Sequence, residues 1–244
     1  MKILVMDSVN GIGSYIRNAS LDYGHDMLLA DMESVSDVTS LTRMLQESDA
    51  QLLLDSTLDA SFARLSSSAA ISLGLPLLYV LQEIAFSGEA NDVENILALS
   101  GGRCTVIKTS WIYGVDGFVR DWVERLADEP VVEVSSSLIS SPTYARDLAD
   151  ALMTVLDAGL QDGFESLSFC GEGVCSLYDF VKEILDRVGY VSHVIPVRTS
   201  DPFCVLSDST KIRQIYGLEI PHWKDSLTAC LMDMDVLPFE YQKL

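Results

Sequence analysis

The sequence predicts an α/β protein in which a parallel β-sheet is wound on both faces by helices and is followed by a smaller C-terminal α/β lobe. Apolar runs typical of strands alternate with segments of helical periodicity along the chain, which is the pattern of a doubly wound parallel sheet. The chain has 244 residues, enough to bury a sizeable core. No internal repeat or flexible linker interrupts the alternation.

The expected strands are short apolar runs. Buried strands of a parallel sheet read as continuous apolar runs, so we assign strands at 3–6, 27–30, 51–54, 77–81, 104–108 and 131–134. Between them, apolar side chains recur at helical spacing in four sets: Ile12, Ile16 and Ala19; Val38, Leu41 and Leu45; Phe118, Trp122 and Leu126; Leu148, Leu152 and Val155. A further helix ends near Gly74, which suits a left-handed position after a helix, and another begins at Asp92.

The pattern changes after Gly163. A short strand at 166–170 leads into a helix at 177–188 and a strand at 193–197, and two helical pieces at 210–216 and 222–232 complete the chain. We therefore expect two parts, residues 1–163 and residues 164–244.

Composition narrows the classes of function. A net charge of −20 and a pI near 4.2 repel nucleic acid and anionic membrane surfaces. No apolar run approaches the ~20 residues of a membrane span, and the N-terminal residues lack a signal-peptide pattern, so a cytoplasmic protein is expected. The five cysteines are scattered and are expected to be reduced thiols. The three histidines lie far apart, so no metal site is expected.

Two motifs carry the most information. Ser141-Pro-Thr-Tyr-Ala-Arg-Asp-Leu-Ala149 follows Lys108-Thr-Ser-Trp-Ile-Tyr-Gly114. Together they resemble the second half of the dTDP-4-dehydrorhamnose reductases, a branch of the extended short-chain dehydrogenase/reductases. Stretches similar to that family also lie at 1–5, 79–88, 171–180 and 208–227. The resemblance implies a Rossmann-type NAD(P)-binding core at 1–163, a small substrate-binding lobe at 164–244, and a nucleotide-sugar ligand.

The loop after the first strand is where the resemblance places the cofactor. Glycine backbones must approach the cofactor diphosphate closely there, and the family has Gly-x-x-Gly-x-x-Gly. Without a gap these positions fall on Asp7, Asn10 and Gly13, whereas a one-residue shift brings in Asn10-Gly-Ile-Gly13. In either alignment the glycine motif of the family is incomplete. The candidate cofactor-binding residues of the loop are Gly11, Ile12 and Gly13.

Asp7 is the most serious departure from the family pattern. Its carboxylate either faces the diphosphate, where like charges ~4–5 Å apart cost on the order of several kcal/mol, or turns to accept backbone N–H groups as an Asx turn. Asp31 is either a ribose-binding residue that favours NAD over NADP or a solvated loop residue. Ser56 and Thr57 occupy a position that lies beside the cofactor in the family. Binding of NAD or NADP stays open.

The catalytic residues of the superfamily are missing at their expected positions. A tyrosine protonates the substrate carbonyl, a lysine four residues later lowers the pKa of that tyrosine, and a Ser or Thr polarises the carbonyl. The family's Ser-Thr-Asp triplet is Leu81-Gln82-Glu83 in this chain, and no tyrosine lies between Tyr79 and Tyr113. The segment carrying Tyr-x-x-x-Lys is therefore interpreted as deleted, and no catalytic residue is assigned.

Other motif residues have plainer interpretations. The one Tyr-x-x-x-Lys, from Tyr178 to Lys182, falls on a helix where the family carries an aromatic packing residue, and we interpret it as a coincidence. Arg146 and Asp147 stand at the start of a helix, where an ion pair or a cap is the simplest role.

The substrate side departs from the family as well. The family's Asp-Gln-x-Gly is Ser137-Leu-Ile-Ser140, and its Arg-Pro is Asp201-Pro202, which reverses the charge where a diphosphate is held. Trp111 and Tyr113 are the candidate substrate-binding residues; they either line a remaining cleft or pack in the core.

Three functions are considered from these observations, the third being an enzyme of another reaction class built on the same cleft. The first is a reductase-like protein that has lost catalysis and acts as a nucleotide or sugar-nucleotide binding, scaffolding or regulatory protein, with a protein partner among its possible ligands. One branch of the family, a regulatory subunit of methionine adenosyltransferase, is a parallel. The alternative is an active NAD(P)H-dependent reductase of a dTDP-4-keto sugar whose acid is Tyr113 or Tyr144.

Overall fold

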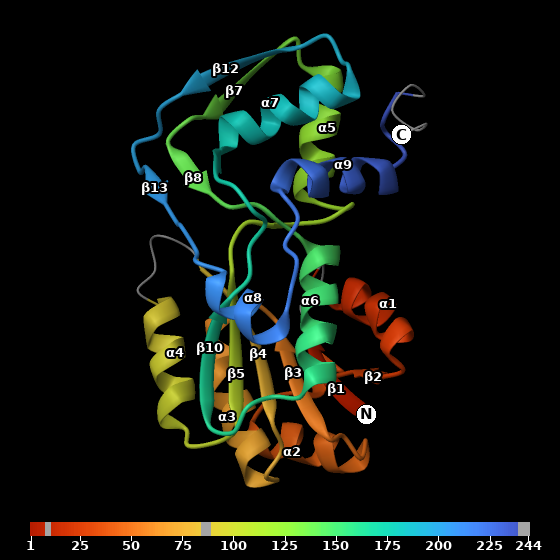
Figure 1. Ribbon diagram of the computed structural model, residues 1–244, viewed down its shortest axis with the longest axis vertical. Coiled ribbons are helices and arrows are strands. Elements are labelled where there is room, and N and C mark those ends of the chain that lie inside the picture. The colour runs from red at the N-terminus through yellow and green to blue at the C-terminus, as the bar shows by residue number, and fades with distance from the viewer. Residues whose placement is uncertain (8–10, 84–88, 239–244) are drawn as a thin grey trace. The chain divides into compact units, whose positions relative to one another are not determined.

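The computed structural model describes residues 1–7, 11–83 and 89–238 (Figure 1). Asn10 of the expected cofactor motif and residues 84–88 of the expected active-site turn lie outside the described residues. The chain divides into two compact units. Unit 1 comprises Met1–Thr109, Leu148–Phe169 and Asp208–Leu218, and unit 2 comprises Ser110–Asp147, Cys170–Ser207 and Glu219–Leu244. The division at residue 163 into a nucleotide-binding core and a smaller C-terminal lobe stays a prediction.

Unit 1 is built on a parallel sheet of six strands in the order β10-β5-β4-β3-β1-β2. The strands are β1 (Lys2–Asp7), β2 (Asp26–Leu29), β3 (Leu52–Ser56), β4 (Leu77–Gln82), β5 (Cys104–Thr109) and β10 (Phe164–Ser168). Four of the six, β1, β3, β4 and β5, lie inside the sheet and are buried along nearly their whole length. Continuous apolar runs mark such strands, which is why the sequence located them.

Helices cover both faces of this sheet. The helices are α1 (Gly13–Tyr23), α2 (Val38–Glu47), α3 (Ala63–Ser72), α4 (Glu89–Leu99), α6 (Ala145–Ala158) and α8 (Thr210–Tyr216). One core cluster joins α2, α3 and α4 to alternate strand residues such as Leu4 and Met6. On the other side, Figure 1 shows α1 beside α6, and the hydroxyls of Tyr23 and Thr154 lie 3.2 Å apart. The predicted doubly wound, Rossmann-type sheet is confirmed.

Local signals explain where several helices begin and end. Asp37 caps α2 in a reciprocal capping box with Ser40, which satisfies backbone donors at the helix start. Gly74 follows α3 with φ +65°, a left-handed conformation that glycine adopts without strain. This position confirms the helix end expected near Gly74. The 3-10 turns η1 (Met32–Ser34) and η2 (Ala60–Phe62) follow β2 and β3.

Unit 2 contains short strands and three helices among its described residues. They are β6 (Ile112–Tyr113), α5 (Phe118–Asp128), β7 (Val131–Ser135), β8 (Leu138–Ser140), β9 (Thr143–Tyr144), β11 (Cys175–Ser176), α7 (Leu177–Val188), β12 (His193–Val197), β13 (Phe203–Cys204) and α9 (Trp223–Asp233). The pairs are β7 with β12, β6 with β9, and β8 with both β11 and β13. An aromatic cluster of Tyr113, Tyr144, Phe118, Phe180 and Trp223 packs in its core.

Two expected strands have partners that the sequence did not indicate. The run at 131–134 is β7, which pairs with β12 in unit 2. The run near 166–170 is β10, which pairs with β5 at the edge of the six-stranded sheet. Pairing depends on contacts far apart in the chain, so a local apolar run predicts a strand but not its neighbour. None of the helices in the described residues has the length and apolar character needed to cross a membrane.

Candidate functional site

The Asp7 carboxylate occupies the turn between β1 and α1. Its Oδ2 accepts a hydrogen bond from the backbone N–H of Gly13 at 2.9 Å. Its Oδ1 lies 3.0 Å from the Ser56 hydroxyl, which also contacts the Met6 carbonyl oxygen at 3.0 Å. The carboxylate is therefore held between the end of β1, the end of β3 and the first residue of α1.

The three loop residues predicted to bind the cofactor are Gly11, Ile12 and Gly13. Gly11 and Gly13 lie against the Asp7 carboxylate, and Ile12 precedes helix α1. A Cβ atom added at Gly11 or at Gly13 would approach the Asp7 carboxylate to under 3.0 Å. Ile12 is buried at the N-cap position of α1, and its side chain makes no capping hydrogen bond. The glycines thus make room for a side chain of the protein itself.

This geometry decides between the two orientations of Asp7 considered from the sequence. The carboxylate does bond a backbone N–H group, but the partner is six residues away, so the contact is not a local Asx turn. Free N–H groups at a helix N-terminus are the groups that bind phosphate. Asp7 therefore takes an N–H group that a diphosphate would use.

Ser56 and Thr57 both engage carboxylates. The Thr57 hydroxyl and backbone N–H donate to Asp55 Oδ1 at 2.7 and 3.1 Å. The Ser66 hydroxyl donates to Asp55 Oδ2. Burial raises the pKa of Asp55, the negative charge of Asp59 adds to that rise, and the hydrogen bonds from Ser66 and Thr57 oppose it.

Sequence reasoning missed Asp55 as a notable group. The expected strand at 51–54 ended one residue before it, although a carboxylate beside an apolar run is a visible signal. Buried carboxylates require hydrogen-bond partners, and those partners, Thr57 and Ser66, lie nearby in the chain. The signal was therefore present but was not used.

Asp31 lies at the end of the β2 segment, where the sequence placed it. Its carboxylate caps the 3-10 turn η1 by accepting the backbone N–H of Glu33 at 3.2 Å and the Ser34 hydroxyl at 2.6 Å. The residue is exposed. The solvated-loop alternative therefore describes its present contacts, and ribose binding stays a prediction.

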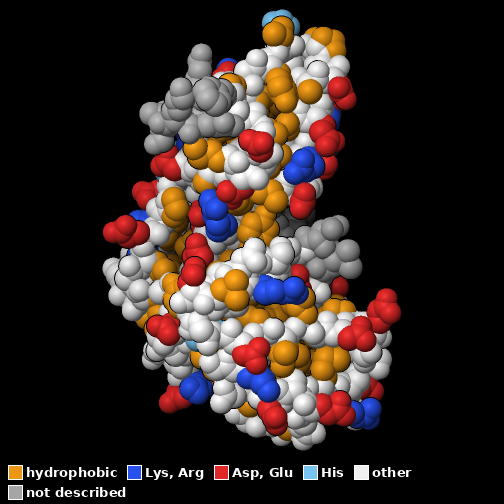
Figure 2. Space-filling model, turned by 90° about the vertical axis from the view of Figure 1, so that its right-hand side faces the viewer, with side chains coloured by type: hydrophobic (Ala, Val, Ile, Leu, Met, Phe, Trp, Pro, Cys, Tyr) orange, Lys and Arg blue, Asp and Glu red, His pale blue; other side chains and the backbone are white. Residues whose placement is uncertain are grey.

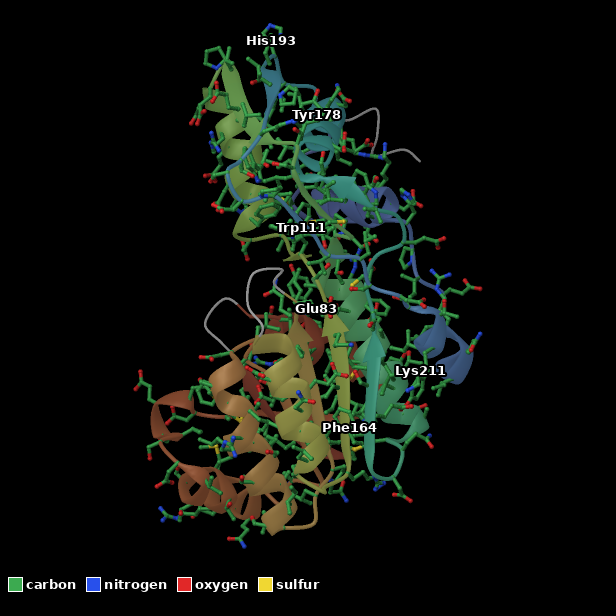
Figure 3. The ribbon with its side chains drawn as sticks, turned by 90° about the vertical axis from the view of Figure 1, so that its left-hand side faces the viewer. Glu83, Trp111, Phe164, Tyr178, His193 and Lys211 are labelled. Carbon is green, nitrogen blue, oxygen red and sulfur yellow. The ribbon has the colours of Figure 1, made fainter. Side chains whose placement is uncertain are left out.

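Acidic side chains follow the carboxyl ends of four strands in unit 1. Asp7 ends β1, Asp31 follows β2, and Asp55 is the penultimate residue of β3. Glu83, labelled in Figure 3, follows β4. Ligands of open α/β sheets bind at this edge. The carboxylates of Asp7, Asp31 and Glu83 therefore place negative charge at this edge, which opposes the approach of a dianionic diphosphate. On the face drawn in Figure 2, by contrast, acidic side chains are spread out and interspersed with basic ones.

The end of β4 carries Gln82 where the family has its carbonyl-polarising hydroxyl. Gln82 pairs in register with Thr109 of β5, and the backbone N–H of Glu83 donates to the Thr109 carbonyl at 2.7 Å. Lys108 contacts Glu94 of α4 at 3.3 Å. The ammonium group of Lys108 is therefore held by a carboxylate of unit 1.

Tyr113 is a core residue of unit 2. Its ring stacks on Tyr144 with centroids 5.5 Å apart, and its hydroxyl lies 3.5 Å from the Trp223 carbonyl oxygen. Burial raises the pKa of Tyr113 well above its ordinary value, with smaller contributions from nearby groups such as Cys230. Tyr113 therefore packs in the core of unit 2, and its substrate-binding role stays a prediction.

Tyr144 donates its hydroxyl to Asp233 Oδ2 at 2.6 Å, and Arg146 contacts the same oxygen at 2.8 Å. Burial raises the pKa of Tyr144, and the hydrogen bond to Asp233 raises it further. Asp147 accepts the Ser226 hydroxyl. Arg146 and Asp147 therefore tie the start of α6 to α9, as their structural interpretation predicted.

Trp111 is half-buried and has φ +41°. Its ring meets Phe203 edge-on at 6.1 Å, and its carbonyl accepts the Thr143 N–H at 3.1 Å. A positive φ is unusual for a residue with a side chain, and residues in such conformations cluster at functional sites. Its substrate-binding role stays a prediction.

The Tyr-x-x-x-Lys motif lies on α7, where Figure 3 labels Tyr178. Lys182 is exposed and pairs with Asp186 one turn later at 3.2 Å, the geometry of an ordinary surface ion pair. Among the residues that the structure describes, no three His, Cys, Asp or Glu side chains are grouped to hold a metal ion. None of the five cysteines, all of which lie in the described part of the chain, forms a disulfide. Burial raises the pKa of Cys104, Cys175 and Cys230 to about 12.

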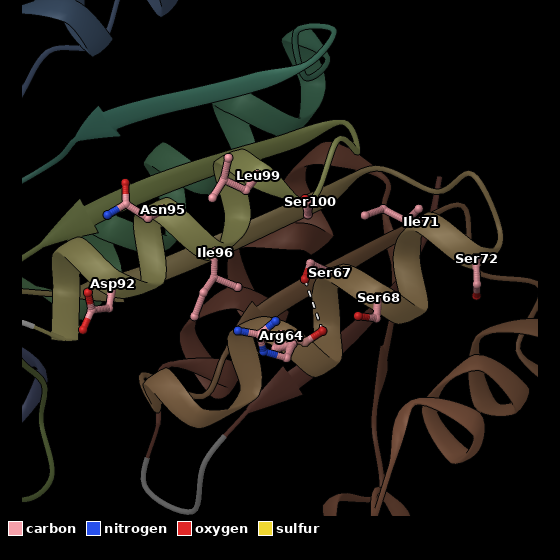
Figure 4. Close-up of a pocket in the computed structure, with 10 residues that line it drawn as sticks. All are labelled: Arg64, Ser67, Ser68, Ile71, Ser72, Asp92, Asn95, Ile96, Leu99 and Ser100. Carbon is pink, nitrogen blue, oxygen red and sulfur yellow. Dashed lines mark hydrogen bonds between the residues drawn. The ribbon is translucent and has the colours of Figure 1, made fainter.

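A separate cavity of about 820 Å³ lies between α3 and α4 of unit 1 (Figure 4). Its apolar lining includes Ile71, Ile96 and Leu99. The hydroxyls of Ser67 and Ser72 donate to backbone carbonyls of their own helix, so these groups offer no activated nucleophile. The lining also includes the charged side chains of Arg64 and Asp92, so the cavity is mixed in polarity.

Comparison with known proteins identifies the family. The family model described as the RmlD substrate binding domain matches residues 86–236, more than half of the chain. The spore coat polysaccharide biosynthesis protein SpsK of Bacillus subtilis is 28% identical over 150 residues, which cover 57% of this chain and 51% of that protein. A dTDP-4-dehydrorhamnose reductase of Aggregatibacter actinomycetemcomitans is 25% identical over 152 residues, covering 55% and 52%. The matched region thus spans about half the length of these relatives.

Solved structures share the fold. A dTDP-4-dehydrorhamnose reductase of Bacillus anthracis in complex with NADP superimposes with a TM-score of 0.84 at 17% identity, covering 95% of this chain and 99% of that one. The enzyme WbmG of Bordetella bronchiseptica in complex with NAD has a TM-score of 0.79 at 17% identity, covering 96% and 94%. The resemblance noted in the sequence is confirmed, and the chain belongs to the family of dTDP-4-dehydrorhamnose reductase-like (RmlD-like) proteins within the short-chain dehydrogenase/reductase superfamily.

Proposed function

We propose that this chain is a divergent member of its family that binds a nucleotide, a nucleotide sugar or a protein partner without transferring hydride. The observation that carries the proposal is the state of its candidate acids. Reduction of a keto sugar needs a group that gives a proton to the carbonyl oxygen as hydride arrives. The phenols considered for this role, Tyr113 and Tyr144, both have raised pKa values because they are buried.

The surroundings of the two tyrosines support the same conclusion. The hydroxyl of Tyr144 is bonded to a carboxylate, which stabilises the protonated phenol rather than the phenolate. A lysine that gripped the nicotinamide ribose would lower a tyrosine's pKa, and Lys108 is instead paired with Glu94. Gln82 at the end of β4 supplies an amide in place of the hydroxyl. The active-reductase alternative would need a proton donor other than these groups.

The turn where the cofactor diphosphate would bind also supports the absence of hydride transfer. Asp7 occupies the turn where a diphosphate would approach the backbone, and Ser56 is bonded to it. Because NAD and NADP are present in solved neighbours, these are the cofactors to test first. The relatives' names make dTDP-linked sugars the first nucleotide sugars to test. Location in the cytoplasm stays a prediction.

The proposal is tested by thermal-shift titration with NADH, NADPH and a dTDP-sugar. A ligand at 100 times its dissociation constant adds about 2.7 kcal/mol to the free energy of unfolding, which is easily detected. We expect no shift with either nicotinamide cofactor at millimolar concentration. A shift with the dTDP-sugar alone would favour nucleotide-sugar binding, and no shift at all would favour a protein partner. Shifts with both ligand types, together with turnover of NADH, would contradict the proposal.

A further inference from the structure

The Asp7 carboxylate fills an anion position with a group from the chain itself. A helix N-terminus presents free N–H groups and a partial positive charge, and both favour a bound anion. In unit 1 the first N–H of α1, that of Gly13, already donates to Asp7 Oδ2 at 2.9 Å. The Ser56 hydroxyl of β3 contacts the other carboxylate oxygen at 3.0 Å. The negative charge is therefore in place without any ligand.

Steric contact restricts the same space. Cβ atoms at Gly11 and Gly13 would both collide with the Asp7 carboxylate. Glycines in such a loop ordinarily let a backbone approach a diphosphate. In this chain the volume above both glycines is taken by Asp7, so the glycines are needed even when no dinucleotide binds.

Charge and volume act together on a dinucleotide. A phosphate that entered the turn would displace Asp7 from Gly13 and Ser56, and it would then face a like charge. At ~4–5 Å and an effective dielectric near 20, one such repulsion corresponds to a loss of affinity of roughly 500-fold. Asp31 follows β2, which pairs with β1, and Glu83 follows β4, which is separated from β1 by β3; both add charge of the same sign to this edge of the sheet.

We propose that Asp7 is an internal substitute for the cofactor diphosphate, that it excludes NAD(H) and NADP(H) from this chain, and that its removal opens the loop to a dinucleotide. This inference rests on the proposed function and deepens it, because it names the residue that closes the cofactor site. It makes Asp7 a specificity-determining residue for the ligands of unit 1.

The test compares NADH affinity, measured by the fluorescence of the bound dihydronicotinamide, across four proteins. Asp7→Gly removes both charge and bulk, whereas Asp7→Asn removes the charge and keeps the bulk. Asp22→Asn, at an exposed position of α1, changes the net charge equally and is the matched control. We expect roughly 500-fold tighter binding for Asp7→Gly than for the wild type, an intermediate gain for Asp7→Asn, and none for Asp22→Asn. ADP-ribose should compete with the gained binding.

A second measurement does not depend on a ligand. In the wild type, Gly13→Ala should lower the midpoint of thermal unfolding because the added Cβ displaces Asp7. In an Asp7→Ala background the same change should leave the midpoint unchanged or raise it, since alanine is the better helix former. Circular dichroism establishes that each variant is folded before it is compared.

The outcomes separate the two proposals. If folded Asp7→Gly binds NADH no better than the wild type, or if Gly13→Ala has the same effect in both backgrounds, the role of Asp7 is wrong. Wild-type affinity equal to that of Asp7→Gly would overturn it as well. None of these results requires hydride transfer, whereas the proposed function fails only when the wild-type chain reduces a sugar.

Discussion

Replacing Phe180 by alanine is expected to lower the free energy of unfolding of unit 2 by about 3–5 kcal/mol. Phe180 is fully buried on α7. Its ring centroid lies 5.2 Å from that of Tyr113, 6.0 Å from that of Phe118 and 5.7 Å from that of Trp223. Removal of the ring leaves a cavity at the centre of this aromatic cluster, and the surrounding rings cannot collapse into it without losing their own contacts.

Urea denaturation followed by tryptophan fluorescence measures this effect. All three tryptophans of the chain, Trp111, Trp122 and Trp223, belong to unit 2, so the signal reports that unit. Phe118→Ala is the matched control, because Phe118 belongs to the same cluster but is 39% exposed. Its expected loss is about 1–2 kcal/mol. Equal losses for the two variants would contradict the assignment of Phe180 to the centre of the core.

Replacing Asp55 by asparagine is expected to remove a pH-dependent part of the stability of unit 1. Burial, aided by the charge of Asp59, raises the pKa of Asp55 in the folded chain above its unfolded value, despite the hydrogen bonds from Ser66 and Thr57. The folded state therefore holds the proton more tightly than the unfolded state does. The contribution of Asp55 to the free energy of unfolding is therefore fully present below its unfolded pKa of about 3.9. This contribution is lost as the pH rises from there through the folded pKa.

The measurement is the difference in free energy of unfolding between wild type and Asp55→Asn at several pH values from 4 to 8, by far-ultraviolet circular dichroism. As pH rises, the free energy of unfolding of the wild type should fall relative to that of the variant. The fall should be about 1.4 kcal/mol for each unit that separates the folded and unfolded pKa values. Ser66→Ala keeps the carboxyl and removes a hydrogen bond that lowers its pKa, so its pH dependence should extend further. A difference that stays constant across this range would show that Asp55 does not titrate as described.

The main elements of the fold could be predicted because their signals are local. Apolar runs located β1, β3, β4 and β5, and the helical spacing of Leu148, Leu152 and Val155 located α6. The pairing of β7 with β12, and of β10 with β5, depends on contacts between distant segments. No local pattern carries that information, so the sheet membership of these two strands was not predicted.

The candidate site was predicted only in part, for a similar reason. The sequence identified Gly11, Gly13, Ser56 and Asp7 as neighbours of a cofactor loop, and the structure brings the Asp7 carboxylate against the other three. It did not indicate that Asp7 reaches the N–H of Gly13, because the direction of a side chain depends on the folded turn.

The partner of Tyr144 was also beyond local reasoning. Asp233, which accepts the Tyr144 hydroxyl, lies 89 positions away in the chain. The contact adds to the rise in the pKa of Tyr144 that burial causes, and it therefore bears on the chemistry of this residue. A single sequence does not indicate which residues so far apart along the chain are in contact in the folded protein.

Hydride transfer itself is tested most directly by a single-turnover experiment with the protein in excess. The chain is mixed with NADH deuterated at the transferable C4 position and with dTDP-4-dehydrorhamnose, and the sugar is examined by mass spectrometry. We predict that at no time will the sugar contain more deuterium than it does in the protein-free control. Deuterium appearing in the sugar at a rate that depends on the protein would contradict the proposal that this chain does not carry out the family's reduction chemistry.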